Sequence, residues 1–131
     1  MNLVDTSVWI DYLRTKTPRA IKARLNHVIQ SPEIATCEPI LFEILRAVST
    51  AEASKIEEFF TTVPVLATPA TLWVDARRLG HRCMAAGFLP RSMDLLIAQI
   101  GIHHEAWVTT SDAHFQRISQ VSSLRLQFLT R

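Results

Sequence analysis

Hydrophobic residues follow two alternating patterns along the chain. Short runs of aliphatic residues, bounded by polar and turn-forming residues, predict buried strands. The expected strands cover residues 2–5, 33–36, 64–67, 106–110 and 125–129. Elsewhere hydrophobic residues return every three or four positions, which is typical of amphipathic helices. The expected helices cover residues 6–13, 18–30, 38–49, 51–62, 70–86, 92–104 and 112–119.

This succession of strands and helices predicts an α/β fold. Parallel strands need long crossover connections, which helices supply. We therefore expect a central, mostly parallel sheet with helices on both faces, in a three-layer α/β/α arrangement. The length of 131 residues suits one domain over residues 1–131. In such sheets ligands bind outside the carboxyl ends of the strands, so residues that follow strands are the first candidates for a site.

Composition narrows the class of protein. Hydrophobic residues make up 48% of the chain, and only 3 Gly and 6 Pro occur, so no linker or disordered tail is expected. The longest apolar runs are too short to span a membrane, and no basic segment precedes the apolar start, so we expect a cytoplasmic protein.

The net charge of +2 permits a polyanionic partner without requiring one. Cys37 and Cys83 lack the spacing of a metal site and are expected to be buried, free thiols.

Three aspartates stand where a helix is expected to begin. Asp5 and Asp112 each follow a predicted strand, and Asp94 lies in the first turn of the helix over 92–104. An aspartate in such a place can cap the helix or interact favourably with its dipole, and Ser92 and Ser111 are alternative caps. Taken singly, each aspartate is explained by its helix.

Glu43 and Asp94 fit that explanation poorly. Glu43 is in mid-helix beside an apolar stripe, so it caps nothing, although it could face solvent or pair with Arg46. Asp94 is the only carboxylate in a helix that is apolar nearly all round and therefore expected to be buried. Burying an unpaired charge is costly, and two carboxylates about 4 Å apart repel by on the order of 4 kcal/mol at an effective dielectric constant of about 20. A divalent cation would remove that repulsion.

Such a cluster of oxygen ligands favours a hard ion, Mg²⁺ or Mn²⁺, over zinc. Mg²⁺ commonly uses one or two protein carboxylates and leaves positions for water and for phosphate oxygens. An ion bound in this open way can activate water and stabilise the charge on a phosphodiester under attack. The carboxylates therefore predict phosphodiester hydrolysis.

Four segments around these carboxylates carry a family resemblance. They read LVDTSVWIDYL around Asp5, FEILR around Glu43, PRSMDLLIA around Asp94 and VTTSDAHF around Asp112. In order, approximate spacing and domain size the whole chain resembles PIN-domain proteins, specifically the VapC-type toxins of type II toxin–antitoxin systems. The motifs are short, but together they are specific.

The resemblance implies a PIN-like α/β/α domain that acts as a Mg²⁺- or Mn²⁺-dependent endoribonuclease. It also implies a homodimer and inhibition by a cognate VapB-type antitoxin. By the same resemblance, Asp5 and Asp94 would be the principal metal ligands and Glu43 would complete the acidic cluster. Asp112 would bind or support a metal through water. Thr6 and Ser7 would support these ligands without touching the metal.

The chain departs from the family at one position. Many PIN domains place a further acidic residue shortly after the fourth carboxylate, but Ala113 and His114 follow Asp112 here, so a fully occupied two-metal site is not predicted. His114 could contact a substrate phosphate or simply be solvated.

Basic and aromatic residues supply candidate contact surfaces. Arg46 and Arg91 stand near Glu43 and Asp94 and could hold RNA phosphates or an acidic tail of the antitoxin, with local ion pairing as the alternative. The basic stretch over residues 14–24 could steer RNA or be a solvated helix face. Trp9, Tyr12 and Leu13 share one helix face, which belongs either to the core or to a groove for an antitoxin helix.

Three alternative functions remain open from the sequence. A PIN-fold nuclease of RNA maturation would more often carry additional RNA-binding segments. A phosphatase or phosphotransfer domain could use Asp5 as a nucleophile, but its usual pattern requires a second aspartate at position 7, where Ser7 stands. A binding module without catalytic activity is the third.

Overall fold

The computed structural model describes residues 1–130 of the chain, and its centre is a parallel sheet. The strands are β1 (Asn2–Val4), β2 (Ile34–Ala35), β3 (Trp107–Thr110) and β4 (Arg125–Phe128). They lie in the order β2-β1-β3-β4, and every pairing between neighbours is parallel. The predicted α/β class and parallel sheet are therefore confirmed.

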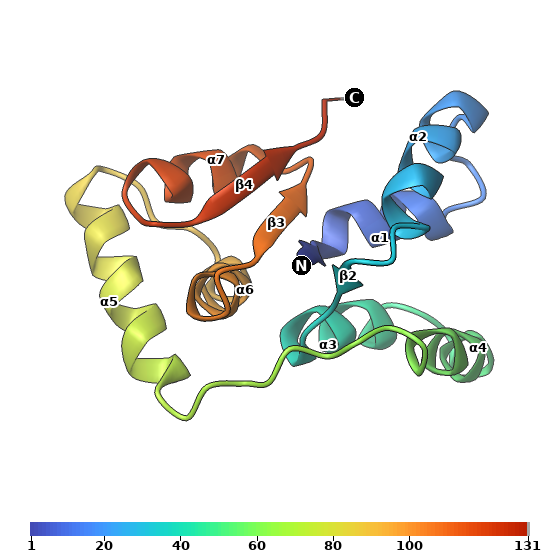
Figure 1. Ribbon diagram of the computed structural model, residues 1–131, viewed down its shortest axis with the longest axis horizontal. Coiled ribbons are helices and arrows are strands. Elements are labelled where there is room, and N and C mark those ends of the chain that lie inside the picture. The colour runs from blue at the N-terminus through green and yellow to red at the C-terminus, as the bar shows by residue number, and fades with distance from the viewer. Residues whose placement is uncertain (131) are drawn as a thin grey trace.

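Helices flank this sheet on both sides (Figure 1). The described helices are α1 (Thr6–Leu13), α2 (Arg19–Ile29), α3 (Glu38–Arg46), α4 (Thr50–Phe60), α5 (Leu72–Ala85), α6 (Ser92–His103) and α7 (Ala113–Gln120). The connection from β1 to β2 runs through α1 and α2 on one side of the sheet, whereas α6, which leads into β3, lies on the other. No helix within residues 1–130 is long and apolar enough to cross a membrane.

The prediction of a strand over residues 64–67 is wrong. The segment makes only an isolated parallel bridge between Thr36 and Val65. In that bridge the Thr36 N–H donates to the Pro64 carbonyl at 2.9 Å, and the Leu66 N–H donates to the Thr36 carbonyl at 2.8 Å. Pro64 has no N–H of its own to continue a ladder, so this segment adds no further strand to the sheet.

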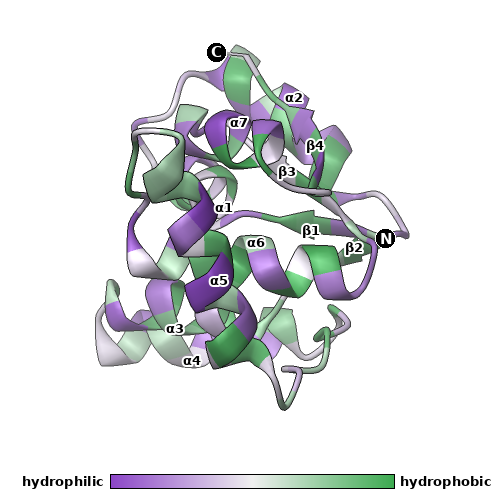
Figure 2. Ribbon diagram, turned by 90° about the vertical axis from the view of Figure 1, so that its left-hand side faces the viewer, coloured by the Kyte–Doolittle hydropathy of each residue, from purple (hydrophilic) through white to green (hydrophobic). Residues whose placement is uncertain are grey.

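The core joins the strands to the buried faces of the helices. Figure 2 shows hydrophobic strands at the centre, with helices that carry both hydrophobic and hydrophilic residues packed around them. Trp9 of α1 is fully buried, and its indole Nε1–H donates to the Val4 carbonyl at 3.1 Å. Trp9 therefore belongs to the core, whereas Leu13 on the same helix is exposed. Cys37 and Cys83 are buried and free, as predicted.

The sheet brings two of the predicted site positions to one edge. Val4 of β1 is level with Thr109 of β3, and the Asp5 N–H donates to the Thr109 carbonyl at 2.9 Å. Asp5 after β1 and Asp112 after β3 therefore lie at the carboxyl ends of adjacent strands. In the order β2-β1-β3-β4 the chain reverses its direction of travel between β1 and β3, which is where parallel sheets bind ligands.

Candidate active site

Asp5 stands at the N-cap position of α1, but its side chain does not cap the helix. No capping hydrogen bond is made by its carboxylate. Instead, Oδ2 accepts hydrogen bonds from the hydroxyls of Ser7 and Thr110, each at 2.8 Å. Asp5 is only 3% exposed, and burial raises the pKa of its carboxyl group above the ordinary value despite these two donors. Helix capping therefore does not explain Asp5.

Glu43 lies in mid-helix in α3 and faces α1. Its Oε1 accepts a hydrogen bond from the Thr6 hydroxyl at 2.8 Å. Among the described residues, no ion pair joins Glu43 to Arg46, whose guanidinium instead lies 5.9 Å from the centre of the Phe42 ring. Glu43 is thus half-buried and turned toward the first turn of α1, the helix that follows Asp5.

Asp94 is a buried acid in the first turn of α6. The residue is 4% exposed, and its Oδ2 accepts a hydrogen bond from Arg91 Nε at 3.2 Å. Burial raises the pKa of this carboxyl group, while the positive charge of Arg91 opposes the rise. The expected burial of this helix and its single carboxylate is confirmed.

Asp112 has two roles in the structure. Its Oδ1 caps α7 by accepting the His114 N–H at 2.9 Å, so the capping interpretation is confirmed for this aspartate. Its Oδ2 accepts from Arg91 Nη2 at 3.0 Å, which makes Arg91 a bridge between Asp112 and Asp94. Local ion pairing, the alternative considered for Arg91, is therefore what this structure contains.

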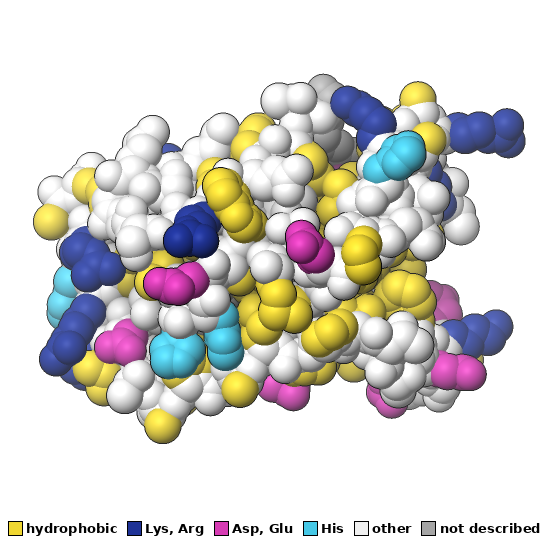
Figure 3. All heavy atoms as spheres, viewed as in Figure 1, with side chains coloured by type: hydrophobic (Ala, Val, Ile, Leu, Met, Phe, Trp, Pro, Cys, Tyr) yellow, Lys and Arg dark blue, Asp and Glu magenta, His cyan; other side chains and the backbone are white. Residues whose placement is uncertain are grey.

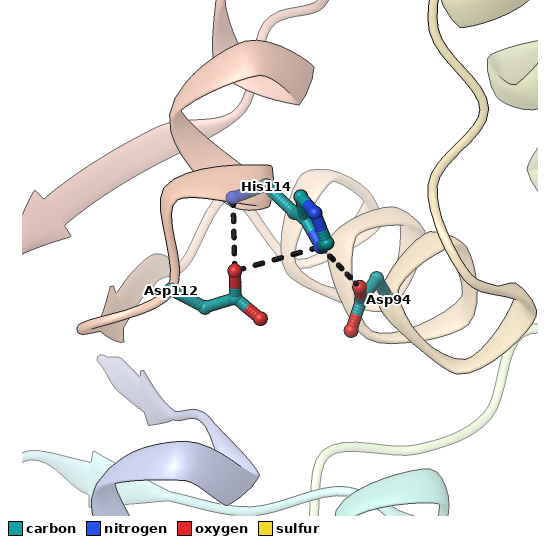
Figure 4. Close-up of side chains that lie close together, drawn as sticks. All are labelled: Asp94, Asp112 and His114. Atoms are coloured by element: carbon teal, nitrogen blue, oxygen red, sulfur yellow. Dashed lines mark hydrogen bonds and ion pairs between the residues drawn. The ribbon is translucent and has the colours of Figure 1, made fainter.

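His114 joins the two aspartates although the sequence did not place it in the core of the site. Its Nδ1 lies 3.7 Å from Asp94 Oδ2 and 3.6 Å from Asp112 Oδ1 (Figure 4). Asp94, Asp112 and His114 each offer a ligand atom, and these atoms lie within 4.8 Å of one another. The signal that could have found His114 is its place two residues after a strand-end aspartate, in the first turn of α7.

Asp5 and Glu43 flank this three-residue group. The negative charge of Asp94 contributes to the raised pKa of Asp5, and the charge of Glu43 contributes to the raised pKa of Arg91, after the larger effect of Asp94. Ser7 connects the two strand ends, since its hydroxyl lies 3.4 Å from that of Ser111 as well as bonding to Asp5. All four predicted carboxylates thus gather at the carboxyl edge of the sheet.

The residues present fit a hard divalent cation. Asp5 and Asp94 are both buried and both have raised carboxyl pKa values, so their charged forms lack full compensation. The carboxylate oxygens of Asp94 and Asp112 and an imidazole nitrogen of His114 are potential ligands for a metal ion. The cluster could therefore bind a metal.

Comparison with known proteins agrees with this geometry. The PIN domain family profile matches residues 3–121. The chain is 32% identical over 129 residues to VapC ribonuclease Mb1587 of Mycobacterium bovis, an alignment that covers 95% of this chain and 96% of that protein. It is 30% identical over 116 residues to ribonuclease VapC19 of Mycobacterium tuberculosis, covering 88% and 92%.

Solved structures share the fold at lower sequence identity. VapBC2 from Rickettsia felis, bound to a DNA fragment from its promoter, has a TM-score of 0.74 at 20% identity and covers 98% of each chain. VapBC-5 from Mycobacterium tuberculosis, a member of the VapBC family of toxin–antitoxin systems, has a TM-score of 0.69 at 19% identity, again over 98% of each chain. From the full-length match in sequence, the arrangement of carboxylates and the shared fold, we conclude that the chain belongs to the PIN-domain family, among the VapC ribonucleases.

Proposed function

We propose that this VapC-family protein is an endoribonuclease toxin that hydrolyses RNA phosphodiester bonds with Mg²⁺ or Mn²⁺. The observation that carries the proposal is the meeting of Asp94, Asp112 and His114 beside buried Asp5, at the edge of the sheet where ligands bind. The ribonuclease relatives favour this function over a phosphatase or a binding module.

Each acidic residue has a distinct part in the proposed site. Asp5 and Asp94 would be the principal metal ligands, because both are buried where the charge of an ion would compensate them. Glu43 would complete the cluster in the orientation that the Thr6 hydroxyl gives it. Asp112 would contribute from the cap of α7, directly or through water. When bound, the ion would acidify the attacking water and neutralise charge that develops on the phosphate.

The proposal is tested by metal-dependent cleavage of a single-stranded RNA oligonucleotide. We expect cleavage with Mg²⁺ or Mn²⁺ and none in excess chelator. Asp5→Asn or Asp94→Asn should each lower the cleavage rate by about 100-fold or more, because each removes a ligand charge. Asp75→Asn is the matched control, since Asp75 lies on α5 and bonds to Thr71 at 2.8 Å. Circular dichroism should show the same fold for all variants, and undiminished cleavage in chelator would rule out the metal mechanism.

The antitoxin is proposed to dock in a groove beside this site. The groove has a volume of about 710 Å³ and lies between α1, α3 and α4. Figure 3 shows the surface hollowed between the part that contains α2 and the part that contains α4. Its apolar lining includes Leu13 and Ile44, and Ile44 directly follows Glu43 in α3. Arg14, Lys16 and Lys55 also line the groove, with Glu52 as the one acid of its lining. The excess of positive charge suits an amphipathic helix with acidic residues.

The homodimer remains a prediction of the family resemblance. Contacts of Arg46 with RNA or antitoxin remain a prediction from its place near Glu43 in the sequence. RNA recognition by loop shape and unpaired bases is not encoded in the carboxylate cluster. Sequencing of RNA ends after expression of the protein would identify the cleaved RNA.

A further inference from the structure

Arg91 bridges the two aspartates of the candidate metal group. Its Nε donates to Asp94 Oδ2 at 3.2 Å and its Nη2 donates to Asp112 Oδ2 at 3.0 Å. His114 approaches the same two carboxylates, but at 3.7 Å and 3.6 Å. The Arg91 guanidinium therefore supplies positive charge at the place where an ion bound by Asp94 and Asp112 would have to supply it.

Arg91 is free to leave this position, whereas the aspartates are not. The Arg91 side chain is 68% exposed, while the side chains of Asp94 and Asp112 are 5% and 21% exposed. Asp112 is also held by the His114 N–H and Asp94 by its place in a buried helix. Opening the bridge leaves the buried Asp94 charge uncompensated, which is costly unless a cation takes the place of the guanidinium.

An ion and Arg91 would compete for the same two carboxylates. Asp94 Oδ2 and Asp112 Oδ2 are the atoms that accept from Arg91, and a cation bound between these side chains needs lone pairs of the same carboxylates. Once displaced, the guanidinium would still be tethered at the N-cap of α6, next to the metal. A planar guanidinium in that place suits a phosphate group, which it can bind with two N–H donors.

We propose that Arg91 compensates the charges of Asp94 and Asp112 in the metal-free protein and holds the two side chains together. When Mg²⁺ or Mn²⁺ binds, the guanidinium leaves both carboxylates. The released side chain then contacts a phosphate of the RNA, and this second step rests on the proposed ribonuclease function. Arg91 thereby competes with the metal and assists the binding of substrate. Binding of the metal therefore also frees the Arg91 guanidinium to bind phosphate.

The competition is tested by calorimetric titration of Mn²⁺ into metal-free protein, without RNA. Arg91→Gln should bind Mn²⁺ about 5- to 10-fold more tightly than the wild type, because the ion no longer has to displace two charged hydrogen bonds. Arg91→Lys should show a smaller gain, since a lysine keeps the charge but lacks the two-pronged geometry. An affinity of Arg91→Gln equal to or weaker than that of the wild type would overturn the proposal.

Arg117→Gln is the matched control for the loss of a nearby positive charge. Arg117 lies one turn after His114 in α7, and its guanidinium packs 4.2 Å from the centre of the Phe88 ring. Its variant should keep the Mn²⁺ affinity within about twofold, because within residues 1–130 Arg117 forms no ion pair with a carboxylate. An equal gain in both variants would show that only the overall charge matters and would contradict the competition.

The second step is tested by cleavage kinetics at saturating Mn²⁺. Arg91→Gln should raise KM for an RNA oligonucleotide more than it lowers kcat, with a weaker dependence of KM on salt. An unchanged KM would overturn the phosphate contact. The Mn²⁺ titration needs no cleavage, so absence of ribonuclease activity would refute the proposed function while the competition is still judged by the calorimetry.

Discussion

At the scale of single residues, hydroxyl groups determine how the acids of the site are held. Thr6 donates to Glu43, while Ser7 and Thr110 both donate to Asp5. A hydroxyl can orient a carboxylate without neutralising it, so the charge stays available for a cation. This differs from Asp94 and Asp112, whose charges are shared with Arg91. Thr6 and Ser7 thus contact the predicted ligands Glu43 and Asp5, and their supporting role in the site stays a prediction.

Thr6→Val should lower the rate of RNA cleavage by about 10-fold or more. Valine has nearly the same shape, but it removes the donor that orients Glu43, and hydrogen bonds to charged groups contribute about 1.5–3 kcal/mol. The measurement is kcat/KM with Mn²⁺ for the variant and the wild type. Thr62→Val is the control, because the Thr62 hydroxyl donates to the Phe59 carbonyl at 2.7 Å in an exposed turn. Wild-type cleavage by Thr6→Val would mean that the orientation of Glu43 does not matter.

At the scale of elements, α6 positions Asp94 by packing closely against the sheet. The helix is apolar nearly all round, and both Ile97 and Ile100 are fully buried. Gly101 makes the close approach to β3 possible, since a Cβ atom at this position would lie 2.8 Å from Val108 Cγ2. Val108 is buried in a central strand and has little room to move. The depth of α6 in the fold, and with it the burial of Asp94, therefore depends on a glycine.

Gly101→Ala should destabilise the protein although alanine is the better helix former. Helix propensity alone favours alanine by about 1 kcal/mol, but overpacking a core typically costs about 1–3 kcal/mol. We expect a Tm a few degrees lower by calorimetry. Gly80→Ala in α5 is the control, because its Cβ would meet only the flexible end of Leu95, at 3.2 Å. A Tm of Gly101→Ala at or above that of Gly80→Ala would show that α6 can move away from the sheet.

At the scale of the whole molecule, the parallel sheet brings distant parts of the chain to one edge. Thr110 bonds to Asp5 across 105 positions of sequence, and Thr6 bonds to Glu43 across 37. The groove between α1, α3 and α4 is lined by other residues of the two helices that carry Thr6 and Glu43. An antitoxin helix in this groove would lie against the two helices that carry Thr6 and Glu43.

Leu13→Asp should abolish neutralisation by the cognate antitoxin and leave RNA cleavage intact. Leu13 is 41% exposed and lines the groove, so a charge there should disfavour an apolar helix face without disturbing the core. The measurement is inhibition of cleavage by the co-expressed antitoxin. Val74→Asp is the control, since Val74 is 40% exposed on α5 and does not line the groove. Full inhibition of Leu13→Asp would place the antitoxin elsewhere.

The order of the elements and the edge of the sheet at which the site forms were predictable from the amino-acid pattern. Hydrophobic periodicity depends on neighbours a few positions away, so it predicted the four strands of the parallel sheet and the helices between them. It also placed Asp5 and Asp112 after predicted strands and identified Glu43 as an acid that caps nothing. The same local reasoning predicted a strand over residues 64–67, where the isolated bridge to Thr36 shows that a suitable pattern does not ensure a pairing partner.

The contacts between side chains of the site were not predictable from the local pattern and follow from how the elements pack. The tertiary structure separated Asp5, which does not cap its helix, from Asp112, which does. It also brought His114 and Arg91 to Asp94 and Asp112, although the sequence did not indicate which of several nearby basic residues would bridge them. Hydrogen bonds and ion pairs form over about 3 Å between side chains from different elements, so they depend on how helices pack on the sheet rather than on local pattern.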